Sequence, residues 1–253
     1  MKKRLGSRLV DRISLFVLSV FQGHLKKGLI EEQYRINKKA WKDYSDKFLG
    51  DGADGIYIEK QSEMKAFRYG TNKGRVGRKL FNGKEMTGAD NTCEVIAVHN
   101  LMRSLGRGSD SVPDFPELLR HFSKKGIAFR GMFGTNPGAM KRFLTGMGYT
   151  VEKLSSPGKN SEKCDELEKD YDAFILTTFN EGQNPFSMVH TMCITKEEGE
   201  NERKIFRIHN DYQGSRSYDS LYKAAVGYND GKGHPIVIYA VRTGQRQDEK
   251  TGV

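Results

Sequence analysis

The sequence predicts an α+β fold in which helices come first along the chain and an antiparallel sheet follows. Apolar residues recur at helical spacing in several segments of the first 148 residues. From residue 149 onward they form short runs or alternate with polar residues, as in strands. Because a run of strands follows a run of helices, we expect a layered structure in which a helix of the first half packs across the sheet.

The first half of the chain contains most of the predicted helices. Residues 1–45 form one or two of them, and Trp41 anchors the second against the rest of the molecule. The stretch 50–82 is rich in glycine and contains one predicted strand, at 55–59. Three further helices are predicted at 93–105, at 114–125 with Pro116 in the first turn, and from Asn136-Pro137 to Met147.

The second half contains the predicted sheet. Its strands are expected at 149–154, 173–179, 190–195, 204–209 and 235–241. Two short helices, at 161–171 and 220–227, lie between strands, and the residues after Arg242 form a polar tail. The strands are expected to pair antiparallel.

Length and composition predict one elaborated domain with an extension. The chain has 253 residues, of which 36% are hydrophobic, and glycine and charged residues crowd together before residue 83. We therefore expect a basic, helical and loop-rich N-terminal extension at 1–82 and the folded domain at 83–253. The three cysteines leave an odd thiol and no disulfide framework, which favours a reducing, cytoplasmic location.

The net charge of +10 comes largely from basic clusters in residues 1–42 and 65–84. Acidic and basic residues mix beyond residue 93, so a nucleic-acid partner is disfavoured. No run of about 18 apolar residues occurs, so no transmembrane helix is expected. The apolar run at 13–21 has helical spacing and no cleavage site after it, which favours an amphipathic helix over a signal peptide. Such a helix packs on the domain, or docks on a protein or an anionic membrane surface.

Cys93 lies where a polar turn leads into a predicted helix. If Asn91 caps that helix, Glu94 completes a capping box and Cys93 occupies the second helical position. The partial positive charge at a helix N-terminus favours the thiolate, which is the nucleophilic form of cysteine.

Two later segments supply partners for this thiol. His190 opens a predicted strand, and Asn210 and Asp211 end the next one. A cysteine on a helix, a histidine on a strand and then an amide or carboxylate is the order of a papain-type active site. His209 precedes Asn210 and so points to the opposite face of the strand, which favours a structural role. Cys193 and His190 are three residues apart in a strand, on opposite faces, so no metal site is expected.

Together with the segment Gly134-Thr-Asn-Pro-Gly-Ala-Met-Lys-Arg-Phe-Leu-Thr-Gly-Met-Gly-Tyr149, these residues resemble the bacteriocin-leader (double-glycine) peptidase branch of the papain-like cysteine peptidase superfamily. The resemblance covers residues 83–242. It implies a papain-like fold with Cys93 as nucleophile, His190 as general base, and Asn210 or Asp211 orienting the imidazole. It further implies a bacterial hydrolase that needs no cofactor and cleaves a peptide or protein substrate through a thioester.

The sequence departs from the pattern of this branch at two positions. A glutamine six residues before the nucleophile normally helps to bind the oxyanion, and Thr87 stands there. Asn91 or Asn82 are the candidates to replace it. Glu94 follows the nucleophile where the family often has glycine, and its carboxylate would raise the pKa of the thiol. The alternatives are therefore an acyltransferase with the same residues, or an inactive papain-like module that binds a peptide or an anionic partner.

Overall fold

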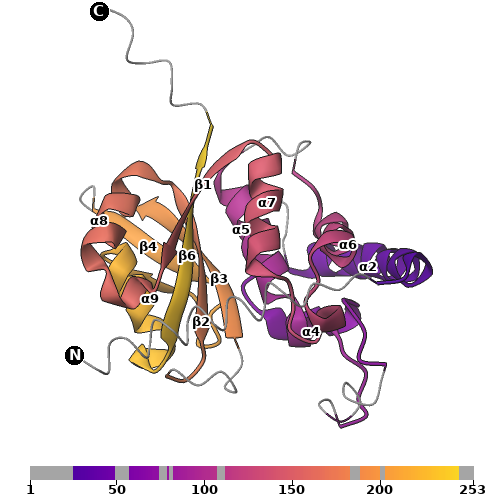
Figure 1. Cartoon of the computed structure of the whole chain (residues 1–253). Helices are drawn as coiled ribbons and strands as arrows, with labels where there is room; N and C mark the ends of the chain where they lie inside the picture. Colours follow the sequence, from indigo (N-terminus) through magenta and orange to yellow (C-terminus); the bar gives the residue numbers. More distant parts are fainter. Residues whose placement is uncertain are drawn as a thin grey trace, which may run out of the picture.

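In the computed structural model of the chain, helices cover both faces of one central sheet (Figure 1). The structure describes residues 25–48, 57–73, 79, 82–106, 112–182, 189–199 and 203–244. The expected amphipathic helix at residues 1–24 lies outside these ranges. None of the described helices has both the length and the apolar character needed to cross a bilayer.

The sheet has six strands in the order β1-β6-β2-β3-β4-β5, and every neighbouring pair is antiparallel. The predicted antiparallel sheet is thus confirmed, and so is the α+β class. The strands are β1 (Tyr149–Ser155), β2 (Ala173–Phe179), β3 (Val189–Glu198), β4 (Lys204–His209), β5 (Arg216–Tyr218) and β6 (His234–Thr243). The short edge strand β5 was not predicted.

Alternate side chains of the strands enter two separate cores, as the period of a β-strand requires. In β2, Ala173 and Ile175 face the helical half of the molecule, whereas Phe174 and Leu176 face the opposite side. The first core is covered by the helices α2 (Lys27–Phe48), α5 (Cys93–Ser104), α6 (Phe115–Lys125) and α7 (Pro137–Gly146). The second is covered by α8 (Ser161–Asp170) and α9 (Leu221–Gly227).

Most of the predicted helices occur close to their predicted positions. Asp114 caps α6 by accepting from the amide of Glu117, and Asn136 caps α7 by accepting from Gly138. The predicted strand at 55–59 is not observed in its described part, residues 57–59, which runs without regular structure into the 3-10 helix η2 (Gln61–Ala66). A tertiary contact explains the difference. The backbone N–H and C=O of Ile58 both bond to the side chain of Asn100 on α5, so they are not available to a neighbouring strand.

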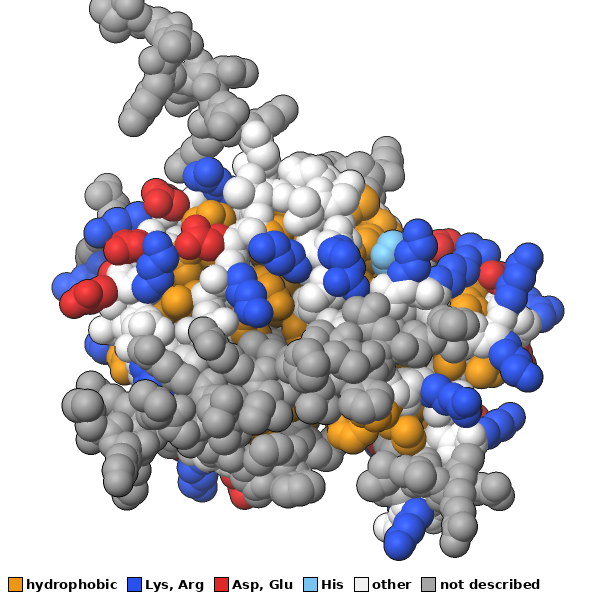
Figure 2. Space-filling view, viewed as in Figure 1, with side chains coloured by type: hydrophobic (Ala, Val, Ile, Leu, Met, Phe, Trp, Pro, Cys, Tyr) orange, Lys and Arg blue, Asp and Glu red, His pale blue; other side chains and the backbone are white. Residues whose placement is uncertain are grey.

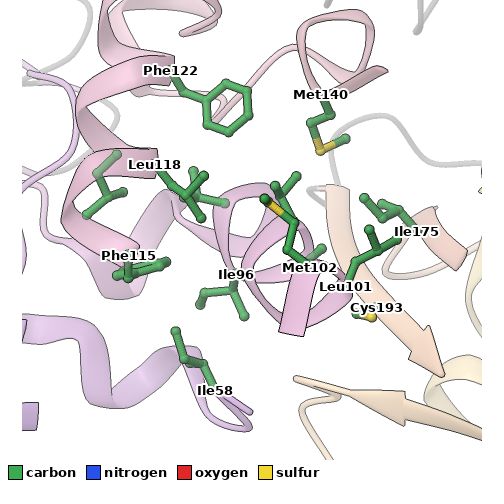
Figure 3. Close-up of a cluster of buried hydrophobic side chains, with 14 of the residues drawn as sticks. Ile58, Ile96, Leu101, Met102, Phe115, Leu118, Phe122, Met140, Ile175 and Cys193 are labelled. Carbon is green, nitrogen blue, oxygen red and sulfur yellow. The ribbon is translucent and has the colours of Figure 1, made fainter. Parts of the chain in front are cut away.

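The described part of residues 1–82 shares the first core with the rest of the chain. Ile58 lies near Ile96 and Phe115, in the buried cluster that also contains Cys193 (Figure 3). The expected boundary at 82/83 therefore does not separate two cores.

Helix α2 is attached to α6 by polar contacts as well as by packing. Arg120 of α6 contacts both carboxylate oxygens of Glu31, at 2.9 and 2.8 Å. As predicted, Trp41 anchors the helix, and its ring packs against His99 of α5 and Phe115 of α6 at centroid distances of 5.4 and 5.6 Å. On the face that Figure 2 shows, Lys and Arg side chains are spread across both halves of the molecule.

Candidate active site

Cys93 is the first residue of α5, which follows the one-turn helix α4 (Gly88–Asn91) with only Thr92 between them. The predicted capping box at Asn91 and Glu94 is wrong. The capping box lies one turn earlier, where Thr87 and Asp90 bond to each other's backbone, and Asp90 accepts from the amide of Thr87 at 2.7 Å. Asn91 does not cap α5 because its side chain is engaged elsewhere.

The Cys93 thiol is 6% exposed and lies between a carboxyl group and the backbone of β3. Burial raises the pKa of Cys93 well above its ordinary value, and the adjacent Glu94 carboxylate raises it further. A hydrogen bond between the backbone of Thr191 and the Cys93 sulfur lowers the pKa of the thiol. Since Thr191 directly follows His190, the thiol lies beside the start of the strand that carries the histidine.

Glu94 is a buried acid next to this thiol. Its carboxylate accepts from the amide of Thr135 at 3.2 Å and contacts Cys93. Burial raises the pKa of Glu94 from 4.5 to about 7. Burial thus favours the protonated acid, and the ionised form opposes the thiolate, as the sequence predicted for a carboxylate at this position.

His190 is fully buried, and one ring nitrogen is fixed by the backbone. Nε2 lies 2.7 Å from the carbonyl oxygen of Asn210. A carbonyl can only accept a hydrogen bond, so Nε2 carries the proton and Nδ1 of the neutral ring carries the lone pair. Nδ1 has no hydrogen-bond partner among the described residues, Cys93 included. Burial lowers the pKa of His190 to about 4, which keeps the ring neutral at physiological pH.

Asn210 contacts His190 through its backbone, not through its side-chain amide. The residue has a φ of 65°, in the left-handed region. Its side-chain oxygen accepts a hydrogen bond from the backbone N–H of Gln61 at 2.8 Å. The backbone N–H of Asn210 donates to the carboxylate of Glu59 at 3.2 Å. Segment 59–61 therefore holds Asn210 in the conformation in which its carbonyl meets the histidine.

Asp211 is buried beside Asn210 but has other partners. Its carboxylate lies 3.4 Å from Nε of Arg216 and accepts from the amide of Gln213 at 3.3 Å. Burial raises the pKa of Asp211. Of the two residues predicted as orienters, Asn210 is the one in hydrogen-bond contact with His190.

The two predicted oxyanion donors are not positioned for that task. Both donor hydrogens of the Asn91 amide are used, because Nδ2 lies 2.7 Å from the carbonyl of Tyr69 and 2.6 Å from that of Gly131. Asn82 is exposed in a turn with a φ of 49°. Thr87, six residues before Cys93, donates its hydroxyl to Asp90. Among the described residues, backbone amides at the start of α5 are candidates that lie next to the Cys93 sulfur.

His209 forms a separate buried network. Its Nδ1 lies 2.7 Å from Glu59, its Nε2 lies 2.8 Å from the hydroxyl of Thr195, and its ring lies against that of Tyr57 with centroids 4.1 Å apart. Its two ring nitrogens thus join β4 to Glu59 on one side and to β3 on the other. Cys193 is buried in the first core.

Four residues around His190 and Asn210 were not predicted from the sequence. Glu59 and Gln61 hold Asn210 from about 150 positions away, and no local pattern marks them. The ring of Tyr212 stacks on that of His190 at a centroid distance of 4.3 Å, and the ring of Tyr228 stacks on the same imidazole at 5.9 Å. An aromatic residue directly after Asn210-Asp211 was the only available signal.

The Glu59→Ala variant is expected to disturb His190 without touching it. Loss of the hydrogen bonds that Glu59 accepts from Asn210 and forms with His209 should lower the free energy of unfolding by about 1–2 kcal/mol, because the acceptor is partly exposed. It should also free Asn210, so that the proton of His190 distributes between both ring nitrogens. Nitrogen-15 NMR of the histidine side chains measures this directly. An unchanged Nε2–H tautomer in Glu59→Ala would contradict the positioning role.

Comparison of the chain with family models, with curated proteins and with solved structures finds no match.

Proposed function

We propose that the chain is a thiol-dependent hydrolase of the papain-like kind, with Cys93 as nucleophile and His190 as general base. The observation that carries this proposal is the state of His190. Its Nε2 is fixed on a backbone carbonyl and its Nδ1 is left without a partner. A buried imidazole with one unpaired, lone-pair nitrogen, on the residue before the backbone group that contacts Cys93, has the form that can accept a proton.

In the proposed reaction, the Cys93 sulfur attacks the carbonyl carbon of a peptide or amide while Nδ1 of His190 takes the thiol proton. Collapse of the tetrahedral intermediate breaks the C–N bond, forms a thioester, and passes that proton to the leaving amine. Water then attacks the thioester carbonyl while His190 takes one of its protons, and as the C–S bond breaks the acid leaves and that proton returns to the Cys93 sulfur. The peptide substrate class comes from the family resemblance of residues 83–242.

Before substrate binds, the Cys93 thiol and the His190 imidazole are expected to be uncharged. Burial raises the pKa of Cys93 and lowers the pKa of His190 to about 4, so an ion pair is disfavoured before substrate binds. The proton would therefore move during the attack rather than before it. Catalytic hydrogen bonds that are absent without substrate can form in the substrate complex.

Two observations favour the alternative of an inactive binding module. The Cys93 thiol contacts Glu94 rather than His190, and the side-chain amide of Asn91, a predicted oxyanion donor, is bound to the carbonyls of Tyr69 and Gly131. An acyltransferase is the second alternative, because it would use the same nucleophile and base with an amine in place of water.

Reaction with p-nitrophenyl acetate separates the three functions. A hydrolase should release one rapid equivalent of p-nitrophenol with acetyl-Cys93 detectable by mass spectrometry, followed by steady turnover. An acyltransferase should hold the acetyl group on Cys93 until a primary amine is added. A binding module should react no faster than a small free thiol, and that result would overturn the proposal. Cys93→Ser provides the blank, and Cys164→Ser is the matched control.

A further inference from the structure

A groove of about 660 Å³ lies between α6 and α7 and contains none of the residues of the proposed active site. Its apolar surface includes Leu118 of α6 together with Ala139 and Phe143 of α7. The ring of Phe143 lies against that of His121 at a centroid distance of 4.7 Å, so the two helices meet inside the groove. Figure 2 shows apolar side chains next to Lys and Arg side chains over these two helices.

Two cations at the groove have no acidic partner. Lys125 of α6 and Arg142 of α7 both line it and are exposed, and neither forms an ion pair with another residue that the structure describes. The groove also has an acidic residue, Glu117, but its carboxylate is engaged elsewhere. It accepts from the hydroxyl of Tyr34 and lies 3.8 Å from Arg120. The groove therefore has an excess of positive charge.

His121 contributes its ring to the groove rather than a third positive charge. Burial lowers the pKa of His121 below 6.5, and the nearby Lys125 and Lys124 lower it further. The imidazole is therefore neutral at pH 7 and extends the surface formed by Phe143. The permanent positive charges of the groove are those of Lys125 and Arg142.

The size of the groove fits a small molecule better than a protein. Small-molecule sites have volumes of about 300–1,000 Å³, and the α6–α7 groove lies within this range. Its ten lining residues are fewer than the roughly 20–30 that each partner contributes to a standard protein interface. An apolar surface next to two cations complements a small molecule that has an apolar tail and an acidic head.

We propose that the groove between α6 and α7 binds a small anionic amphiphile, a carboxylate on an apolar tail, at a site separate from the proposed active site. The tail lies on Leu118, Phe143 and the ring of His121, where its apolar surface is removed from water. The carboxylate pairs with Lys125 and Arg142 through charge-assisted hydrogen bonds. The ligand thereby supplies the negative charge that these two cations lack.

Calorimetric titration of the full chain with decanoate, decanol and decyltrimethylammonium tests this assignment, because the three probes share a tail and differ in the charge of the head. We expect decanoate to bind at least about tenfold more tightly than the other two, with an affinity that falls as salt is added. Equal affinities for decanoate and decanol, or tighter binding of the cationic probe, would overturn the inference.

The Gly146→Phe variant tests the location of the site. Gly146 lines the groove, and a Cβ added there meets no atom within 4 Å, so the larger side chain can fill the groove without disturbing α7. This variant should no longer bind decanoate. Gly28→Phe is the matched control, because Gly28 lies in α2 and its Cβ position is equally open. The control should bind decanoate as the wild type does.

The Arg142→Glu variant tests the role of charge without altering a buried residue. It should weaken decanoate binding about tenfold or more and leave the affinity for decanol unchanged. Lys39→Glu changes the net charge by the same amount at an exposed position of α2 and should have no effect. Wild-type affinity for decanoate in both Gly146→Phe and Arg142→Glu would place the ligand elsewhere and overturn the inference. All these experiments measure binding alone, so their outcome is independent of the hydrolase proposal.

Discussion

The Glu94→Gln variant is expected to be more stable than the wild type at pH 8 and to react faster with thiol reagents. The pKa of Glu94 is raised from 4.5 to about 7 in the folded chain. A group whose pKa is raised on folding contributes its full stability below the unfolded pKa and loses it as the pH rises through the folded pKa. The wild type should therefore lose roughly 3 kcal/mol between pH 4.5 and pH 8 that the variant keeps.

Urea denaturation of both proteins at pH 4.5, 6 and 8 measures this difference, and Glu162→Gln, which alters an exposed acid, is the control. Removal of the carboxylate should also lower the pKa of Cys93 and raise its alkylation rate at pH 8 about tenfold. Slower alkylation in Glu94→Gln would contradict this role and would instead identify Glu94 as the base that accepts the thiol proton.

The Asn91→Ala variant is expected to lose about 3 kcal/mol of stability. The substitution removes two buried hydrogen bonds and leaves the carbonyls of Tyr69 and Gly131 without their donor. Asn91→Asp should be no better, because a carboxylate has no N–H to donate. Thermal and urea denaturation measure the loss.

Asn82→Gly is the matched control, since this exposed residue already has a positive φ. It should change stability by no more than about 0.5 kcal/mol. If Asn91 were instead an oxyanion donor, Asn91→Ala would lower turnover of p-nitrophenyl acetate about a hundredfold with stability unchanged.

The elements that local sequence determines were predictable. Helices α5, α6 and α7 and five of the six strands follow from apolar periodicity, capping residues and proline placement, which depend on neighbours in sequence. The three-residue strand β5 and the single turn α4 are too short to produce a period. The strand expected at 55–59 failed because Asn100, more than 40 positions away, takes both backbone bonds of Ile58.

In the candidate site, too, the order of the residues was predictable but their contacts were not. The order of Cys93, His190 and Asn210 was visible in the sequence, and the structure brings the start of β3 to Cys93 and Asn210 to His190. The contact through the backbone carbonyl of Asn210 was not predictable, because it depends on a left-handed φ enforced by Glu59 and Gln61. Likewise, Asn91 is of a residue type that often caps helices, but its side-chain amide instead donates to the carbonyls of Tyr69 and Gly131.

The most direct test of the account is the rate of Cys93 alkylation by iodoacetamide between pH 4 and pH 9, in the wild type and in His190→Ala. If His190 is the base, its neutral ring should accelerate the wild type about tenfold or more over the variant at pH 7. Because the pKa of His190 is about 4, this advantage should persist to about pH 5 and disappear as the pH falls through 4. Identical profiles for the two proteins, each with an ordinary thiol titration, would contradict the assignment of Cys93 and His190 as a catalytic pair.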